Sequence, residues 1–201
     1  MTDGQSGQRA EPRIVIVSGP SGTGKTTVVR RLIETAPVPI IKAVTATTRS
    51  PRPGEINERD YRFLSSDEFD KLRGEGRFLE TAEVFGTGTW YGTPRSEVER
   101  AERLGAWSLL EIDVRGALEI KRQFAHAVMI FLKAASAEEY EARLRGRGTE
   151  SDEAIRSRLE RMREELRFAD HYEFQVINDD VERAVAEISG ILQRQEAERD
   201  A

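Results

Sequence analysis

This sequence has no cysteine among its 201 residues, which excludes both a disulfide framework and a thiolate zinc site. It also has no stretch that approaches the roughly 18 consecutive apolar residues of a membrane span. The N-terminal segment MTDGQSGQRAEPR lacks the apolar centre of a signal peptide. The net charge of −5 lacks the basic excess of a broad nucleic-acid surface, although it allows a local basic patch that binds a small anion. These absences favour a cytoplasmic protein with no membrane or nucleic-acid partner.

Short apolar runs alternate with helical patterns along the chain, which predicts an α/β fold with a mostly parallel sheet. The run IVIVS at 14–18 contains four β-branched residues and is too short for a buried helix, so it predicts a strand covered on both faces. A helix is expected over 25–36, where Pro37 ends it. Further strands are expected at 40–44, 109–112, 128–132 and 174–177. The last helix carries an apolar stripe of Val181, Val185, Ile188 and Leu192.

The pattern divides the chain into a core and two inserted segments. Residues 1–13 are polar and are expected to form a disordered tail. A three-layer core is expected over 14–44, 94–135 and 169–201. Residues 45–93 have short strands and Pro/Gly-marked turns, which predict a small α+β insert. Residues 136–168 are helical and rich in arginine, and form the second insert.

The nonapeptide GPSGTGKTT follows the first strand and opens the first helix, as the P-loop motif G-x-x-x-x-G-K-[ST] requires. Its glycines allow backbone N–H groups to turn inward around an anion, and the helix N-terminus adds its positive dipole end. Lys25 supplies a charge for the β- and γ-phosphates, while the Thr26 hydroxyl is the predicted Mg²⁺ ligand. A glycine-rich turn that binds nothing is the alternative, and agreement at all four fixed positions disfavours it. The predicted ATP-binding residues are Gly19, Pro20, Ser21, Gly22, Thr23, Gly24, Lys25, Thr26 and Thr27.

A second segment, TATTRSPRPGE, helps to decide to which class of P-loop protein the chain belongs. Arg49 and Arg52 bracket a Ser-Pro turn, and two guanidinium groups on a stiffened loop can converge on one phosphate through forked hydrogen bonds. The alternative for this segment alone is a solvated basic loop.

With these two segments, the sequence resembles the guanylate kinase family from about residue 14 to residue 192. The resemblance rests on blocks in the family's order: GPSGTGKTT, TTRSPRPGEINERDY, FLE, WYGT, EIDVRG, RLRGRGTES and INDD. It implies Mg²⁺-dependent transfer of the γ-phosphoryl group of ATP to GMP or dGMP. It also implies that 45–93 is a GMP-binding insert and that 136–168 is a mobile lid.

The resemblance assigns two groups of residues to GMP. The GMP phosphate is assigned to Arg49, Arg52, Tyr61 and Tyr91. The guanine base is assigned to Thr45, Glu80, Thr93 and Asp113. A carboxylate such as Glu80 suits guanine because the base offers donors at N1 and N2, which adenine lacks. Taken alone, Glu80 would be read as a surface carboxylate.

The resemblance makes Arg143, Arg147 and Arg158 lid arginines that stabilise the phosphoryl group in transfer, so they are counted as catalytic with Lys25. Asn178 matches a block that lies near adenine in the family, but an Asn-Asp pair that ends a strand is also ordinary turn chemistry. Both interpretations of Asn178 remain open, and Asp180 is expected to cap the last helix.

Several positions depart from the family pattern. Glu111 stands where aspartate is usual, and Thr45 and Thr93 stand where serine is frequent, so the hydroxyl is kept. Trp90 stands where tyrosine is frequent. Because Glu111 and Asp113 are two apart, both are expected on one face of a strand near its carboxyl end.

Three rival functions follow from the same motifs. A kinase-like interaction module would bind peptides without turnover, but such modules typically lose the P-loop lysine and lid arginines that are intact here. A kinase for another phosphorylated acceptor is disfavoured by Glu80 and Asp113. A nucleic-acid-dependent ATPase is disfavoured by the acidic balance and the short chain. The sequence gives no oligomeric state.

Overall fold

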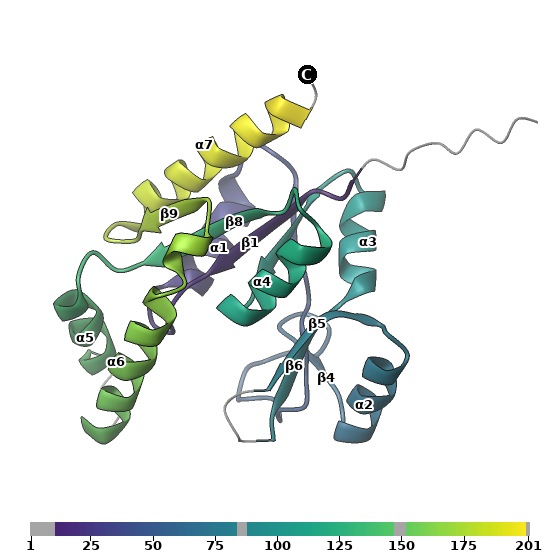
Figure 1. Ribbon diagram of the computed structural model, residues 1–201, viewed down its shortest axis with the longest axis horizontal. Coiled ribbons are helices and arrows are strands. Elements are labelled where there is room, and N and C mark those ends of the chain that lie inside the picture. The colour runs from purple at the N-terminus through teal and green to yellow at the C-terminus, as the bar shows by residue number, and fades with distance from the viewer. Residues whose placement is uncertain (1–10, 84–87, 147–151, 200–201) are drawn as a thin grey trace, which may run out of the picture.

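The computed structural model describes residues 11–83, 88–146 and 152–199, and its centre is a five-stranded sheet (Figure 1). Its order is β2-β7-β1-β8-β9, and every neighbouring pair is parallel. This confirms the predicted α/β fold with a mostly parallel sheet. The strands are β1 (Ile14–Ser18), β2 (Ile40–Lys42), β7 (Trp107–Glu111), β8 (Val128–Lys133) and β9 (Phe174–Ile177).

Helices cover both faces of this sheet. Val15 and Val17 point into a core shared with α1 (Lys25–Thr35) and α7 (Val181–Arg199). Ile14 and Ile16 point to the other face, into a core shared with α3 (Arg95–Arg103) and α4 (Val114–Gln123). Burial on both faces explains why IVIVS is apolar without alternation, since each side chain meets a helical layer.

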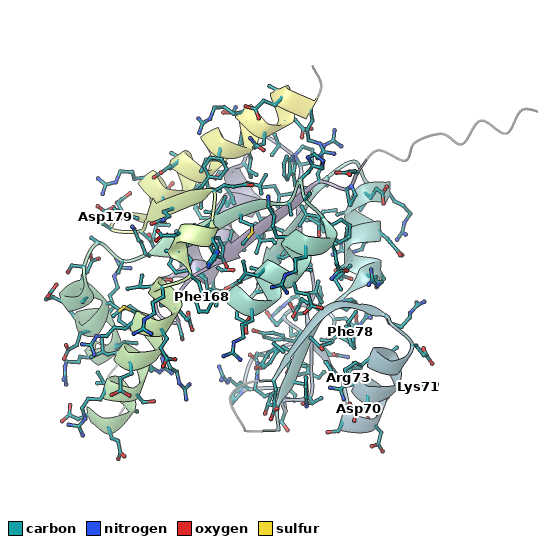
Figure 2. The ribbon with its side chains drawn as sticks, viewed as in Figure 1. Asp70, Lys71, Arg73, Phe78, Phe168 and Asp179 are labelled. Carbon is teal, nitrogen blue, oxygen red and sulfur yellow. The ribbon has the colours of Figure 1, made fainter. Side chains whose placement is uncertain are left out.

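A second, smaller sheet lies beside the carboxyl ends of the central strands (Figure 1). Its order is β4-β3-β6-β5, and helix α2 (Ser66–Gly74) packs on it. Phe69 of α2 stacks on Phe78 with ring centroids 4.7 Å apart, and the Arg73 guanidinium lies 4.4 Å from the centroid of the Trp90 ring (Figure 2). The strands are β3 (Ala46–Thr47), β4 (Arg62–Phe63), β5 (Phe78–Glu83) and β6 (Trp90–Pro94).

Two further helices, α5 (Ala137–Arg145) and α6 (Asp152–Leu166), follow β8 and pack on each other. Their contact is a small apolar cluster of Tyr140, Leu144, Ile155 and Met162. A 3-10 turn (Ala169–His171) returns the chain to β9. In Figure 1, α5 and α6 lie on the other side of the central strands' carboxyl ends from the second sheet. Across the described ranges, every helix is too short or too polar to span a lipid bilayer.

Candidate active site

The P-loop follows β1, which is the middle strand of the sheet. Gly19 has φ of 143°, and a Cβ there would lie 2.0 Å from the Leu132 carbonyl oxygen. Gly24 has φ of 87°, and a Cβ there would lie 2.5 Å from Asn178 Nδ2. Both positions therefore favour glycine, because the backbone has a positive φ, and because the backbone of β8 at Gly19 and the Asn178 side chain at Gly24 leave no room for a Cβ.

Lys25 is the first residue of α1, and its ammonium group folds back over the loop. Lys25 Nζ donates to the carbonyl oxygens of Gly19 at 2.6 Å and Pro20 at 3.0 Å. Burial lowers the pKa of Lys25, while the carboxylates of Glu111 and Glu165 oppose that shift. The ammonium group therefore already lies at the loop, where it can donate to a bound phosphate.

Thr26 faces a carboxylate at the end of β7. Its hydroxyl donates to Glu111 Oε1 at 2.7 Å, and Lys42 Nζ lies 2.8 Å from Glu111 Oε2. Burial favours a higher pKa for Glu111, but Lys42 and the Thr26 hydrogen bond outweigh it and hold the pKa below its usual value. The glutamate that replaces the family's usual aspartate therefore stays ionised beside the start of the P-loop helix.

The expectation that Glu111 and Asp113 share a strand is wrong. Strand β7 ends at Glu111, and Asp113 is the N-cap of α4, where its side chain accepts from Gly116 N at 2.8 Å. An aspartate before a helical run is a strong N-cap, and this local preference ends the strand earlier than the two-residue spacing suggests. Both carboxylates nevertheless line the same cleft.

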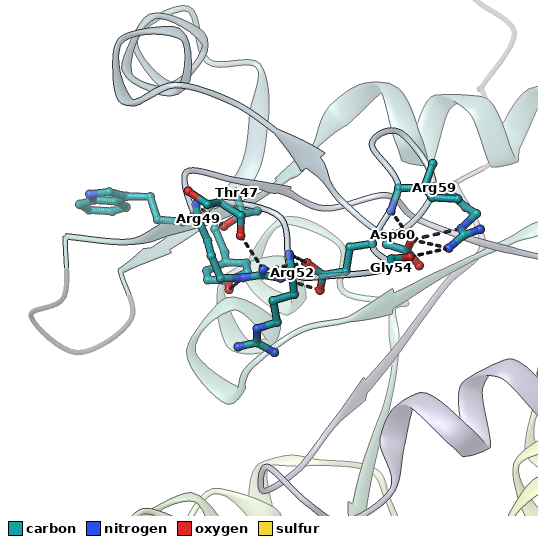
Figure 3. A network of polar contacts seen from close by, with 11 residues as sticks. Thr47, Arg49, Arg52, Gly54, Arg59 and Asp60 are labelled. Atoms are coloured by element: carbon teal, nitrogen blue, oxygen red, sulfur yellow. Dashed lines mark hydrogen bonds and ion pairs between the residues drawn. The ribbon is translucent and has the colours of Figure 1, made fainter. Parts of the chain in front are cut away.

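Arg49, in the turn that follows β3, is held from several sides (Figure 3). Its guanidinium donates to both oxygens of Glu55, at 2.8 Å and 2.9 Å, and its Nε donates to the Tyr91 hydroxyl at 3.1 Å. The guanidinium carbon also lies 5.2 Å from the centroid of the Tyr61 ring. Glu55 and the Tyr91 hydroxyl therefore fix the plane of the guanidinium group, and the Tyr61 ring lies close to it.

Glu55 was missed by the sequence analysis, although it ends the quoted segment TATTRSPRPGE. It also accepts from Arg52 N at 2.7 Å, so one carboxylate organises both ends of the turn (Figure 3). Hydrogen bonds from the Arg49 side chain and the Arg52 backbone lower the pKa of Glu55 to about 2. The Arg52 side chain is exposed. No residue pattern signals this role, because an acidic residue in a polar turn is common.

Glu80 is a buried carboxyl group, 4% exposed, at the junction of the second sheet and α4. The Thr93 hydroxyl donates to Glu80 Oε1 at 2.7 Å. A Cβ at Gly116 would lie 2.9 Å from Glu80 Oε2, so the glycine of EIDVRG makes room for the carboxyl group. Burial raises the pKa of Glu80 to about 7, and the Thr93 hydrogen bond opposes that shift.

Members of both predicted groups line one cleft of about 350 Å³, whereas Arg52, Asn178, Arg143 and Arg158 are not among its lining residues. P-loop residues line it together with residues of the second sheet. Its lining residues are Gly19, Ser21, Lys25, Thr45, Tyr61, Glu80, Ala82, Tyr91, Glu111, Ile112, Asp113 and Glu165. Arg49 and Thr93 lie behind this lining. Arg49 donates to Tyr91, and Thr93 donates to Glu80.

Glu165 of α6 is a second residue that the sequence analysis missed. It lines the cleft, and burial raises its pKa while the charge of Lys25 opposes the shift. It lies in the glutamate- and arginine-rich helix, where the sequence alone favours solvated ion pairs.

The predicted lid arginines have different surroundings. Arg143 of α5 pairs with Glu139 and donates to the Asn178 carbonyl oxygen at 2.6 Å. Arg158 lies on α6 and is half-buried. Arg147 lies outside the described residues.

Asn178 follows β9 and is only 3% exposed. Its side-chain Nδ2 donates to the Thr23 carbonyl oxygen of the P-loop at 2.7 Å. Asp180 Oδ1 accepts from Arg183 N at 2.9 Å, which confirms the predicted cap of the last helix.

Comparisons with known proteins agree on one family. The family model of guanylate kinase matches residues 11–195. The guanylate kinase of Rubrobacter xylanophilus is 47% identical over 182 residues, which cover 90% of this chain and 94% of that protein. The guanylate kinase of Rhodopirellula baltica is 46% identical over 181 residues, which cover 90% of this chain and 87% of that protein. The crystal structure of guanylate kinase from Anaplasma phagocytophilum has a TM-score of 0.73 and 31% identity, and covers 93% of this chain and 87% of that one.

Proposed function

The chain belongs to the guanylate kinase family, and we propose that its P-loop holds ATP while the Arg49–Tyr91 group holds the phosphate of GMP. The enzyme is an ATP:GMP phosphotransferase. One observation supports these two roles: residues of the P-loop and residues of the second sheet line the same cleft.

The ATP phosphates are received by the N–H groups of the P-loop and the start of α1. Lys25 Nζ now donates to two carbonyl oxygens of the loop, and a phosphate oxygen is a stronger, charged acceptor for the same ammonium group. Binding therefore exchanges two neutral acceptors for an anion, without moving Lys25 far from the loop.

The residues fit Mg²⁺ held jointly by protein and nucleotide. Thr26 offers an exposed hydroxyl at the start of α1, and ionised Glu111 lies 2.7 Å from it. Oxygen ligands of this kind suit Mg²⁺, which usually takes one or two protein oxygens together with substrate phosphates. When bound, Mg²⁺ neutralises charge on the phosphates.

The GMP phosphate is bound by Arg49, with Tyr61 and Tyr91 beside it and Arg52 reaching from the same turn. Glu55 holds the Arg49 fork in a fixed plane, so less side-chain freedom is lost when a phosphate binds. The phosphate of GMP is itself the nucleophile. It is already an anion near neutral pH, because its second ionisation has a pKa of about 6, and no protein base is required.

Guanine is selected by Glu80, Thr93, Thr45 and Asp113. An ionised Glu80 accepts from the N1 and N2 donors of guanine, and the Thr93 hydrogen bond keeps its carboxyl group oriented. Adenine has no such donors on that edge, so it would leave a buried carboxylate unpaired.

Transfer is completed when α5 and α6 approach the nucleotides. Arg143, Arg147 and Arg158 then supply positive charge to the phosphoryl group, and closure excludes water so that GMP is the acceptor.

A coupled assay of ADP formation with an acceptor panel tests this function. ATP is supplied with GMP, dGMP, AMP, UMP or TMP in turn. We expect turnover with GMP and dGMP and little with the others. ADP formation at the same rate without any acceptor, or a preference for a pyrimidine nucleotide, would contradict the proposal.

A further inference from the structure

We propose that Asn178 is a positioning residue that orients the P-loop amides and links the loop to α5, and that its side chain does not select the base of the donor nucleotide. The proposal rests on the phosphotransferase function above.

The side chain of Asn178 is committed to the P-loop. It is 3% exposed, and its Nδ2 donates to the Thr23 carbonyl oxygen at 2.7 Å. The same nitrogen lies 2.5 Å from the position that a Cβ of Gly24 would occupy. A group so enclosed presents little surface to a nucleobase that arrives from solvent.

Fixing the Thr23 carbonyl also fixes an N–H group. The Thr23 carbonyl and the Gly24 N–H belong to one planar peptide unit, and the described chain contains no cis peptide. In a trans unit the two groups point in opposite directions. The hydrogen bond to Asn178 therefore aims the Gly24 N–H away from Asn178, and a P-loop binds phosphate with such N–H groups.

The backbone of Asn178 is hydrogen-bonded on both sides, in addition to its side chain. Asn178 N donates to the Lys133 carbonyl oxygen at 2.8 Å, which extends the pairing of β9 with β8. Its carbonyl oxygen accepts from Arg143 Nη2 at 2.6 Å. One residue thus joins β8, the P-loop and helix α5, which carries Arg143.

Helix α5 has a parallel contact with the same loop. The Tyr140 hydroxyl donates to the Ser21 carbonyl oxygen, which orients the Gly22 N–H in the same way. A Cβ at Gly22 would lie 3.1 Å from Leu144 Cδ2, so the helix packs closely on the loop. Alternate P-loop carbonyls are therefore held from outside, one by α5 directly and one by Asn178.

The test uses Asn178→Asp, which keeps the shape of the side chain but replaces the donor with a second oxygen. Asn178→Ala is measured beside it, because it removes only the side-chain bond and keeps the carbonyl that accepts from Arg143. Asn57→Asp is the matched control: Asn57 Oδ1 accepts from Phe63 N at 2.9 Å, and a carboxylate can still accept there.

Initial rates are measured with GMP as acceptor and ATP, GTP or UTP as donor, which share a triphosphate and differ in base. We expect kcat to fall about tenfold or more in both Asn178 variants, by the same factor for each donor, so that the preference among donors is unchanged. Asn57→Asp should keep kcat within about twofold.

An unchanged kcat in Asn178→Ala would overturn the proposal, and so would loss of the donor preference in either Asn178 variant. If Asn178→Asp does not fold, as judged by its thermal melt, Asn178→Ala alone carries the comparison, because it buries no new charge. The wild-type arm separates this proposal from the assigned function, since absence of GMP phosphorylation there would refute the function whatever the variants do.

Discussion

The Thr93 hydroxyl lies 2.7 Å from Glu80 Oε1, and this hydrogen bond joins the two residues at the boundary between the second sheet and the core. Glu80 is buried, so the hydroxyl supplies part of the polar environment that water would otherwise provide. Threonine at this position therefore supplies the hydroxyl donor that serine would also offer.

Thr93→Val removes that hydroxyl while keeping the branched shape. We expect kcat/KM for GMP to fall about tenfold, because Glu80 loses a partner that favours its ionised form. Thr93→Ser keeps the hydroxyl and is the control, with a change of about threefold or less. A Thr93→Val enzyme that keeps the wild-type kcat/KM for GMP would contradict the role of the hydrogen bond, and a Thr93→Ser enzyme that loses as much as Thr93→Val would show that the loss is not specific to the hydroxyl.

Glu80 also makes stability depend on pH. Its pKa is about 7 in the fold against 4.5 in the unfolded chain, so folding favours the protonated form. The free energy of unfolding should therefore fall as the pH rises from about 4.5 to about 7, by about 2–4 kcal/mol relative to Glu80→Gln.

The measurement is urea unfolding of both proteins without nucleotide across that pH range. The comparison with Glu80→Gln removes the contribution of other titrating groups. A constant difference between the two proteins at every pH would contradict the assignment.

Lys25→Ala should lower kcat about 100-fold or more, because the ammonium group stabilises charge that develops on the transferred group. The fold should survive, since the lysine donates only to two carbonyl oxygens of its own loop. Lys71→Ala, at an exposed position of α2, is the control and should leave kcat unchanged. Steady-state kinetics with a thermal melt of each variant check this prediction.

Arg49→Lys keeps the charge and removes the fork. We expect KM for GMP to rise about tenfold or more, because lysine cannot bond both Glu55 oxygens and Tyr91 in one plane. KM for ATP should hardly change. Arg59→Lys is the control from the next turn of the chain, where Arg59 is exposed and pairs with Asp60 (Figure 3). A rise in KM for ATP as large as that for GMP would contradict the assignment.

The sequence predicts those parts of the site that depend on local backbone chemistry. The P-loop follows from its motif and its flanks, and IVIVS follows from burial on both faces of β1. It does not predict Glu55 or Glu165, because an acidic residue in a turn or a charged helix has many uses, and only tertiary contact reveals these two. The Asn178 contact with Thr23 joins residues 155 positions apart, and no local pattern encodes it.

The error at Asp113 has a different origin. Two-residue spacing assumes that a strand continues, whereas the helix-capping preference of aspartate acts over only a few residues and ended the strand at Glu111. At Asp113 the cap prevails.

The most direct measurement is a crystal structure of the protein with GMP and a non-hydrolysable ATP analogue. The account predicts guanine at Glu80, the GMP phosphate at Arg49 and Tyr91, and the γ-phosphate at Lys25. An acceptor oxygen of GMP should then lie about 3–3.5 Å from the γ-phosphorus. GMP bound away from Glu80, or phosphates that face different surfaces of the closed protein, would contradict it.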